Sequence, residues 1–314
     1  YAQKNLPDPS CWTIQQLNLN SQLHDNLLIS DSLVVWELHN DDQRGVFYYD
    51  ETEILELCYN GQSCYAPAVY ENQIACGAPG GILHFDGQLQ KLIPAPHGSF
   101  ADNPDIYGNR LFWEIFLCLD FPAIFFYNGQ ETVCLTDDDK CFKNGKSPKV
   151  SHDTIAWLSH DGNDFEVFIL KDNQIQQLTN NETDEEKLMI SDHGKLAWIN
   201  GKSQTFFYDG KTVDTVSSKS TYSQPVGICD RGVFYIEQNN THRKTQRCRF
   251  FDGTETTMIF QEHSLTDKML HSSYGNNSFA WYSENNQQLF FYNSKNITSW
   301  EFRATTQTPP LSVW

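Results

Sequence analysis

The chain has 314 residues, a formal net charge of −18 at pH 7 and 14% aromatic residues, with only three Met. The negative charge argues against nucleic acid or anionic lipid as a partner, because proteins bind both through Lys and Arg. The aromatic content, with abundant Asn, Ser and Thr, favours strands and polar turns over helices. No apolar run is long enough to cross a bilayer, so no transmembrane segment is expected.

A repeat of seven copies dominates the chain. Each copy contains a short first strand, an apolar second strand, a third strand such as "IFFYN" or "TFFYD", and a short fourth strand. The copies cover residues 29–57, 69–93, 106–136, 150–179, 190–217, 228–260 and 274–302. The residues that end the second apolar run lie roughly 37 to 46 positions apart, which is the period of one four-stranded propeller blade; they are Trp36, Cys76, Trp113, Trp157, Trp198, Tyr235 and Trp281.

The second and third strands are nearly continuous apolar runs, although antiparallel strands with one wet face usually alternate. A propeller blade is packed between two neighbours, so both of its faces are dry and alternation is lost. Four copies place a hairpin dipeptide that accepts positive φ after the third strand, at Asp86-Gly87, Asn128-Gly129, Asp209-Gly210 and Asp252-Gly253. The sequence therefore predicts an all-β, seven-bladed β-propeller of four-stranded antiparallel blades.

The predicted propeller domain covers residues 1–303, and residues 304–314 form an extended tail. Residues 13–17 match the fourth strand of another copy but have no blade of their own. We expect them to join the last blade and fasten the ring, which removes exposed strand edges. Ile297 to Phe302 also has the pattern of a fourth strand for that blade, so one of the two segments is an extra strand or a tail.

The motif D-G-N-D-x-E at Asp161 to Glu166, followed by Q-L-T at Gln177 to Thr179, resembles TolB-type propeller repeats. This resemblance implies the propeller fold and secreted or periplasmic binding roles. It implies no activity, since propellers carry many unrelated functions.

Six of the nine cysteines form three candidate disulfides in or beside polar connections, Cys58–Cys64, Cys134–Cys141 and Cys229–Cys248. Such bonds predict an oxidising compartment: extracellular, cell surface or periplasmic. The alternative is a set of reduced, half-buried thiols. Cys11, Cys76 and Cys118 have no assigned pairing. The sequence begins at Tyr1, as a processed secreted chain would, and so would a trimmed one.

The turn between the second and third strands of the third copy is apolar, where the other copies are polar. It contains four candidate partner-binding residues, and the tail adds two more: Phe116, Leu117, Leu119, Phe121, Leu311 and Trp314. The turn either folds onto a neighbouring connection or forms an apolar patch that binds a partner. The tail either packs on its own propeller or docks on a second copy.

No catalytic motif is present, so the sequence predicts no catalytic residue and no metal or cofactor. Titratable and aromatic residues in the predicted turns beside the channel mouth are candidates for a site there: Tyr70, Tyr107, His152, His193, Asp230 and Tyr274. A calcium loop at Asp161, Asn163 and Asp164 is a weaker alternative, because the stretch lacks a bidentate acid at the required spacing.

These features predict a secreted, non-enzymatic propeller that binds or scaffolds a protein or glycan partner. One form of this hypothesis is a homo-oligomer assembled through the apolar turn at residues 114–123 and the C-terminal tail. The first alternative is a lectin-like, carbohydrate-binding propeller. The second is a polysaccharide lyase or glycoside hydrolase with its site at the channel mouth.

Overall fold

The computed structural model describes residues 24–301 except for gaps in some connections. The gaps are residues 31–32, 40–43, 51, 60, 97–98, 117–121, 137–143, 240–244, 264–269, 276–277, 284–287 and 293–296. No helix in the described part of the chain has the length and apolar character that a membrane span requires.

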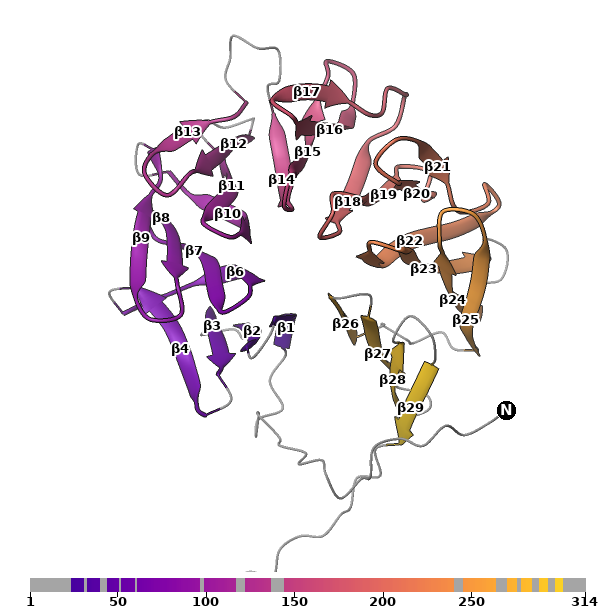
Figure 1. The fold of residues 1–314 in the computed structure, drawn as a ribbon, viewed down its shortest axis with the longest axis horizontal. Helices are drawn as coiled ribbons and strands as arrows, with labels where there is room; N and C mark the ends of the chain where they lie inside the picture. The colour runs from indigo at the N-terminus through magenta and orange to yellow at the C-terminus, as the bar shows by residue number, and fades with distance from the viewer. Residues whose placement is uncertain are drawn as a thin grey trace, which may run out of the picture.

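The described strands form six four-stranded antiparallel sheets and one sheet of five strands, arranged around a common axis in Figure 1. The five-stranded sheet contains β1 (His24–Ser30), β2 (Leu33–His39), β3 (Arg44–Tyr49), β4 (Ile54–Tyr59) and β5 (Gln62–Ser63). The next sheets contain β6 (Tyr65–Tyr70), β7 (Gln73–Ala78), β8 (Gly81–Phe85) and β9 (Gln90–Pro94); β10 (Ala101–Tyr107), β11 (Arg110–Phe116), β12 (Pro122–Tyr127) and β13 (Thr132–Cys134); and β14 (Gly145–Val150), β15 (Thr154–His160), β16 (Phe165–Lys171) and β17 (Gln174–Gln177).

The remaining sheets follow in chain order. They contain β18 (Glu185–Ile190), β19 (Leu196–Asn200), β20 (Thr205–Tyr208) and β21 (Val213–Thr215); β22 (Thr221–Cys229), β23 (Gly232–Asn239), β24 (Thr245–Phe251) and β25 (Thr256–His263); and β26 (Leu270–Gly275), β27 (Ser278–Ser283), β28 (Gln288–Tyr292) and β29 (Ile297–Glu301). The all-β propeller predicted from the repeat is therefore confirmed. In every sheet the first strand lies nearest the axis and the later strands lie progressively outward (Figure 1).

Burial across a sheet explains the apolar pattern of the repeat. Trp113, Trp157 and Trp198 are fully buried, and every residue of β19 is buried. The outermost strands are more exposed: β17 and β21 contain no buried residue, although Leu57 of β4 and Ile93 of β9 are buried. Alternation is lost in the middle strands because both faces pack against neighbouring sheets, and it returns at the wet outer edge.

The predicted tight turns between third and fourth strands are present and have the expected geometry. Gly87, Gly129, Gly210 and Gly253 all adopt positive φ, between 92° and 102°. In each turn the preceding Asp or Asn side chain accepts hydrogen bonds from backbone N–H groups two and three residues later. This is the local bonding that makes Asp-Gly and Asn-Gly effective turn dipeptides.

The first strands contain a bulge at which a non-glycine residue adopts positive φ. The left-handed residues are Ala66 (φ 47°), Asn103 (φ 46°), Ser147 (φ 53°) and Lys187 (φ 53°), each inside a register shift of its strand pair. Such a bulge redirects a backbone N–H group out of the ladder. At Ala66 and Ser147 that N–H binds a carboxylate of the preceding sheet, so the bulges help to join neighbouring sheets.

The first and last sheets meet near the axis, where β1 contacts β26. The outer strand of the last sheet is β29, which pairs with β28, so the fourth-strand pattern at the C-terminal end is confirmed. Residues 13–17 and the tail at 304–314 lie outside the described residues. The fastening role of residues 13–17 therefore stays a prediction.

Two of the three predicted disulfides are wrong. Cys64 is a buried free thiol beside Cys76, so it does not bridge to Cys58. Cys229 is also a free thiol: it lies on β22 and Cys248 on β24, with β23 between them. Two strand spacings amount to roughly 9.5 Å, which exceeds the ~7 Å Cα separation that a disulfide can bridge.

The third predicted disulfide involves Cys141, which lies outside the described residues. The prediction of an oxidising compartment depended on all three disulfides. Because two of them do not form, most of the support for that prediction is lost.

In the predicted apolar turn, the backbone of Phe116 pairs with Pro122 at the end of the β11–β12 hairpin. Leu117, Leu119, Phe121, Leu311 and Trp314 lie outside the described residues.

Candidate functional site

Five of the six residues predicted at the channel mouth lie along one end of the ring in two contacting groups, Tyr70 with Tyr107 and His152, and His193 with Asp230. We call Tyr70, Tyr107, His152, His193 and Asp230 the rim. Each lies at or beside the turn between the first and second strands of its sheet, and consecutive sheets run in the same sense, so these turns share one end. The sixth residue, Tyr274, belongs to β26, where only the backbone is described.

The aromatic half of the rim joins three sheets. The rings of Tyr70 and Tyr107 lie 4.4 Å apart between centroids, and the His152 ring meets Tyr107 edge-on at 6.0 Å. Arg110 fixes this contact: its guanidinium donates to the backbone carbonyls of Ser151 and His152, both at 2.7 Å, and lies 5.7 Å from the Tyr107 ring centroid. Burial, with hydrogen bonding to Tyr107, raises the pKa of Tyr70 above its ordinary value, so its hydroxyl stays protonated.

The charged half of the rim joins the next two sheets. Asp230 accepts hydrogen bonds from the backbone N–H of His193 at 3.0 Å and meets the His193 ring, with Nδ1 2.6 Å from Oδ2. The His193 side chain is 78% exposed, so it is available to a ligand. Burial, followed by the nearby Asp230 charge, raises the pKa of Asp192. The backbone N–H of His152 donates to the carbonyl of Asp192 and connects the two halves.

The rim can bind and orient a ligand through aromatic faces, imidazole nitrogens and a carboxylate. Cys229, which precedes Asp230, is buried, and burial raises the pKa of its thiol. An activated cysteine nucleophile requires the opposite shift. Cys229 therefore lacks the lowered pKa of an activated thiol.

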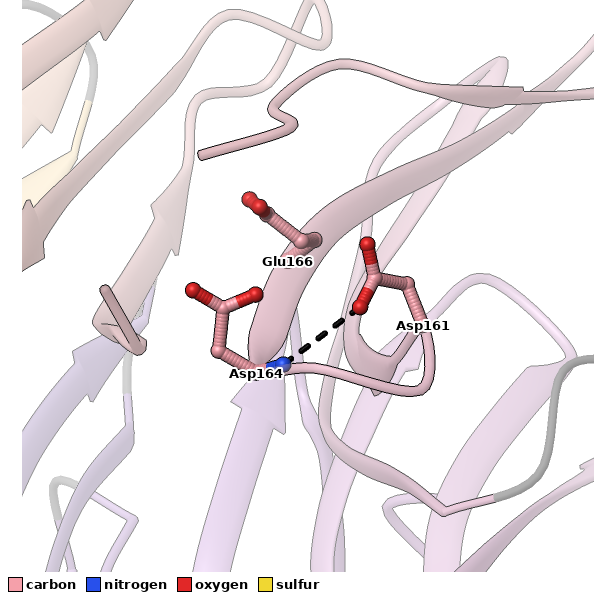
Figure 2. Close-up of side chains that lie close together, drawn as sticks. All are labelled: Asp161, Asp164 and Glu166. Carbon is pink, nitrogen blue, oxygen red and sulfur yellow. Dashed lines mark hydrogen bonds between the residues drawn. The ribbon is translucent and has the colours of Figure 1, made fainter. Parts of the chain in front are cut away.

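A second group of titratable residues lies away from the rim, at the β15–β16 hairpin. Asp161, Asp164 and Glu166 each place one carboxylate oxygen within 4.8 Å of the others (Figure 2). Glu185, the first residue of β18, adds a fourth carboxylate from the next sheet and shares the Asn181 side-chain amide with Glu166. We call these four residues the acidic cluster.

The pKa values of the four acids in the cluster shift in different directions. Hydrogen bonds from the backbone N–H groups of Asn163 and Asp164 lower the pKa of Asp161. Burial raises the pKa of Asp164 and of Glu166, and it raises the pKa of Glu185 to about 8. Among the described residues, Asp164 Oδ2 and Glu185 Oε2 are buried without a hydrogen-bond partner.

The turns of the repeat place the rim residues at one end of the ring, as expected, whereas no local signal in the sequence indicates Arg110, Glu166 or Glu185. Glu166 belongs to the D-G-N-D-x-E motif. It is fully buried, and the spacing of the motif does not indicate this burial. Glu185 belongs to an acidic run that has the composition of a solvated turn, yet it begins a strand and is 1% exposed. Only the packing of one sheet on the next brings it to the hairpin.

The sequence matches no family model and no curated protein. Solved structures match over nearly the whole chain. A prolyl endopeptidase is 11% identical with a TM-score of 0.58, and the match covers 92% of this chain and 49% of that one. A puromycin hydrolase is 9% identical with a TM-score of 0.61, covering 93% and 55%.

The propeller domain of the Trilobed protease from Pyrococcus furiosus, described as having an open velcro topology, is 11% identical with a TM-score of 0.59. That match covers 93% of this chain and 98% of the domain. The propeller fold that the resemblance to TolB-type repeats implies is confirmed by the match to this propeller domain. At these identities the matches show the fold alone.

The comparisons overturn the function predicted from the sequence. The sequence predicted a secreted, non-enzymatic propeller that binds or scaffolds another macromolecule, one form of which self-assembles through residues 114–123 and the tail. The alternatives were a lectin-like propeller and a polysaccharide lyase or glycoside hydrolase. The matched structures over nine-tenths of the chain are instead peptidases. This chain spans about half the length of those peptidases, and it shares its propeller fold with one part of them.

Proposed function

We propose that this chain is the propeller part of a peptidase and works beside a catalytic domain that supplies the nucleophile. One observation carries the proposal: the match takes in nine-tenths of this chain but only about half of each peptidase. The Trilobed protease propeller, matched over nearly its full length, also supports this, because it is one domain of a protease.

We also infer that the ring has seven blades, with the five-stranded sheet as the blade that begins the chain. The two-residue strand β5 pairs only at Cys58 and Tyr59 of β4, so it is a short extension of the outer edge. The other strands, β1 to β4, have the same order and pairing as each four-stranded sheet.

The rim is the surface that we assign to peptide recognition in this arrangement. Tyrosine rings provide flat apolar contact with polar tips, and His193 and Asp230 provide hydrogen-bonding groups for a peptide backbone. Arg110 is a positioning residue, because its Nη2 donates to two backbone carbonyls of the neighbouring turn.

The test isolates the natural protein with an antibody raised against residues 24–301 and measures its intact mass and its hydrolysis of fluorogenic prolyl and N-acyl aminoacyl peptides. We expect a protein, or a complex, about twice the length of this chain, whose hydrolytic activity elutes with the propeller in constant ratio. A species no larger than this chain, without bound hydrolase and without hydrolysis, would overturn the proposal.

A rim variant of the same protein separates the role of the rim from the presence of the peptidase. His152→Ala combined with His193→Ala should change the kcat/KM ratio between a long and a short peptide. The matched control is His160→Ala, because His160 ends β15 at the hairpin to β16, at the opposite end of that strand from the turn that holds His152. An unchanged ratio would refute peptide recognition by the rim and leave the peptidase association in place.

A further inference from the structure

The acidic cluster places several carboxylates in a buried position, which is energetically unfavourable without a compensating positive charge. Asp164 is 7% exposed, and its Oδ2 has no hydrogen-bond partner among the described residues. Glu185 is 1% exposed, and its Oε2 lacks a partner of good hydrogen-bond geometry, although the Trp198 side chain lies close enough to lower the pKa of Glu185. A buried carboxylate oxygen without a donor or a positive charge costs free energy, because it has lost its hydration without compensation.

The surroundings of the cluster provide few positive charges. None of the ion pairs between described residues includes Asp161, Asp164, Glu166 or Glu185. The nearest imidazole, His160, uses Nδ1 to accept the Gly162 N–H and packs its ring edge-on against Phe165. Lys146 places its ammonium over the same Phe165 ring, 3.5 Å from the centroid. Burial and the neighbouring carboxylates raise the pKa of Asp164 and outweigh the His160 charge, which lowers the pKa of Asp164 and of Asp161.

The geometry of the cluster fits one bound ion. Ligand oxygens of Asp161, Asp164 and Glu166 lie within 4.8 Å of one another, and two oxygens on opposite sides of a Ca²⁺ ion at roughly 2.4 Å each would be about 4.8 Å apart. All the ligands are oxygens, the donor type preferred by hard divalent cations. Figure 2 shows the three carboxylates grouped on the same hairpin.

We propose that the acidic cluster binds one hard divalent cation, Ca²⁺, between the β15–β16 hairpin and the first strand of the next sheet. Asp161, Asp164 and Glu166 are the ligands from the hairpin, and Glu185 is the ligand from β18. The linker already fixes this junction: Asp184 Oδ1 accepts the Phe165 N–H at 2.9 Å, and the Asn181 N–H donates to Glu166 at 2.5 Å. The ion joins the two sheets more firmly at the same point.

The experiment uses the purified chain after removal of divalent ions with EDTA and gel filtration. Tb³⁺ luminescence excited through tryptophan reports occupancy, because Trp198 lies beside Glu185, and Ca²⁺ is then titrated as a competitor. Calorimetry with Ca²⁺ alone gives the stoichiometry, and the melting temperature with and without Ca²⁺ gives the effect on stability.

Asp164→Asn and Glu185→Gln test the ligands, and Asp209→Asn is the matched control. Asp209 occupies the same kind of turn, with its carboxylate bonded to the N–H groups of Lys211 and Thr212, but it has no acidic cluster around it. We expect one Ca²⁺ per chain, at least a tenfold loss of affinity in each ligand variant, and unchanged affinity in the control.

Two results would overturn the proposal. Absence of Ca²⁺ heat, Tb³⁺ luminescence and any Ca²⁺-dependent change in melting temperature would show that the carboxylates stay empty. Equal affinity in wild type, Asp164→Asn and Glu185→Gln would place the ion on another acidic surface. The proposal is independent of the peptidase assignment, because neither result concerns hydrolysis.

Discussion

Two junctions between neighbouring sheets differ in whether their buried carboxylates have hydrogen-bond donors. Between the β10–β13 and β14–β17 sheets, Glu114 Oε2 accepts the Ser147 N–H at 2.9 Å and Asp105 Oδ2 accepts the Val150 N–H at 2.7 Å. Between the β14–β17 and β18–β21 sheets, Asp164 and Glu185 each keep an oxygen without a described donor. In the first junction, backbone N–H groups satisfy the buried carboxylates, whereas the second junction keeps carboxylate oxygens that could accept a further bond or bind a cation.

The two junctions also differ at their bulges. At Ser147 the left-handed backbone turns an N–H group toward the carboxylate of the preceding sheet. The corresponding bulge of β18 has Lys187 at the left-handed position, and the Lys187 side chain hydrogen-bonds to Gln224 of the following sheet. A carboxylate that accepts a redirected N–H is a structural fastener, and one that keeps an unpaired oxygen among other carboxylates is a candidate ion ligand.

The largest expected effect is at the complete junction. Glu114→Ala removes the acceptor of the Ser147 N–H and of the Asn103 side-chain amide in a site that is 4% exposed. We expect a loss of about 2 to 4 kcal/mol in the free energy of unfolding, since buried donors are left unpaired. Urea denaturation measures it, and Glu255→Ala at an exposed turn is the control. A loss under about 0.5 kcal/mol would contradict the fastener role.

The same residue gives a pH dependence. Burial raises the pKa of Glu114 and nearby Asp102 adds to the increase, while hydrogen bonds from Ser147 and Asn103 and the charge of Lys149 oppose it. The pKa of Glu114 in the folded state exceeds its value of about 4.3 in the unfolded state. Protonated Glu114 therefore contributes to the free energy of unfolding in full below about pH 4.3, and this contribution is lost as the pH rises through the folded-state pKa.

Glu114→Gln cannot lose a proton, so its stability relative to wild type should increase as pH rises from about 4 upward through the folded-state pKa. Urea midpoints at matched pH values test this, with Glu255→Gln as the exposed reference. A difference that falls with increasing pH would mean that the hydrogen bonds outweigh burial.

The sequence was sufficient for the propeller because the apolar second and third strands recur in every copy and the tight turns in four of them. An apolar second strand ending at residues such as Trp157 and a turn such as Asp209-Gly210 depend only on neighbours in the chain, and the structure has both. The rim was also predictable, since the turn positions follow from the repeat. Cys229 and Glu185 were not, because their surroundings come from strands that pack beside them rather than from sequence neighbours.

A smaller effect, of opposite sign, is expected at the open junction. In the presence of EDTA, Asp164→Asn removes a charge that Asp161 and Asp184 repel, so the free energy of unfolding should rise by up to about 1 kcal/mol. Asp209→Asn should leave it nearly unchanged, because the amide oxygen keeps the turn hydrogen bonds. A decrease of more than about 1 kcal/mol in Asp164→Asn would show that this junction is as complete as the first.

The smallest effect is expected at the rim, where the His193–Asp230 pair is short but open to water. The His193 side chain is 78% exposed and that of Asp230 is 29% exposed, so solvent screens their attraction. A double-mutant cycle with His193→Gln and Asp230→Asn should give a coupling of about 0.5 kcal/mol or less, which 1 M salt removes. A coupling above about 1.5 kcal/mol would mean that the rim is built like the buried Glu114 junction, and a surface so rigid would suit a structural contact better than peptide recognition.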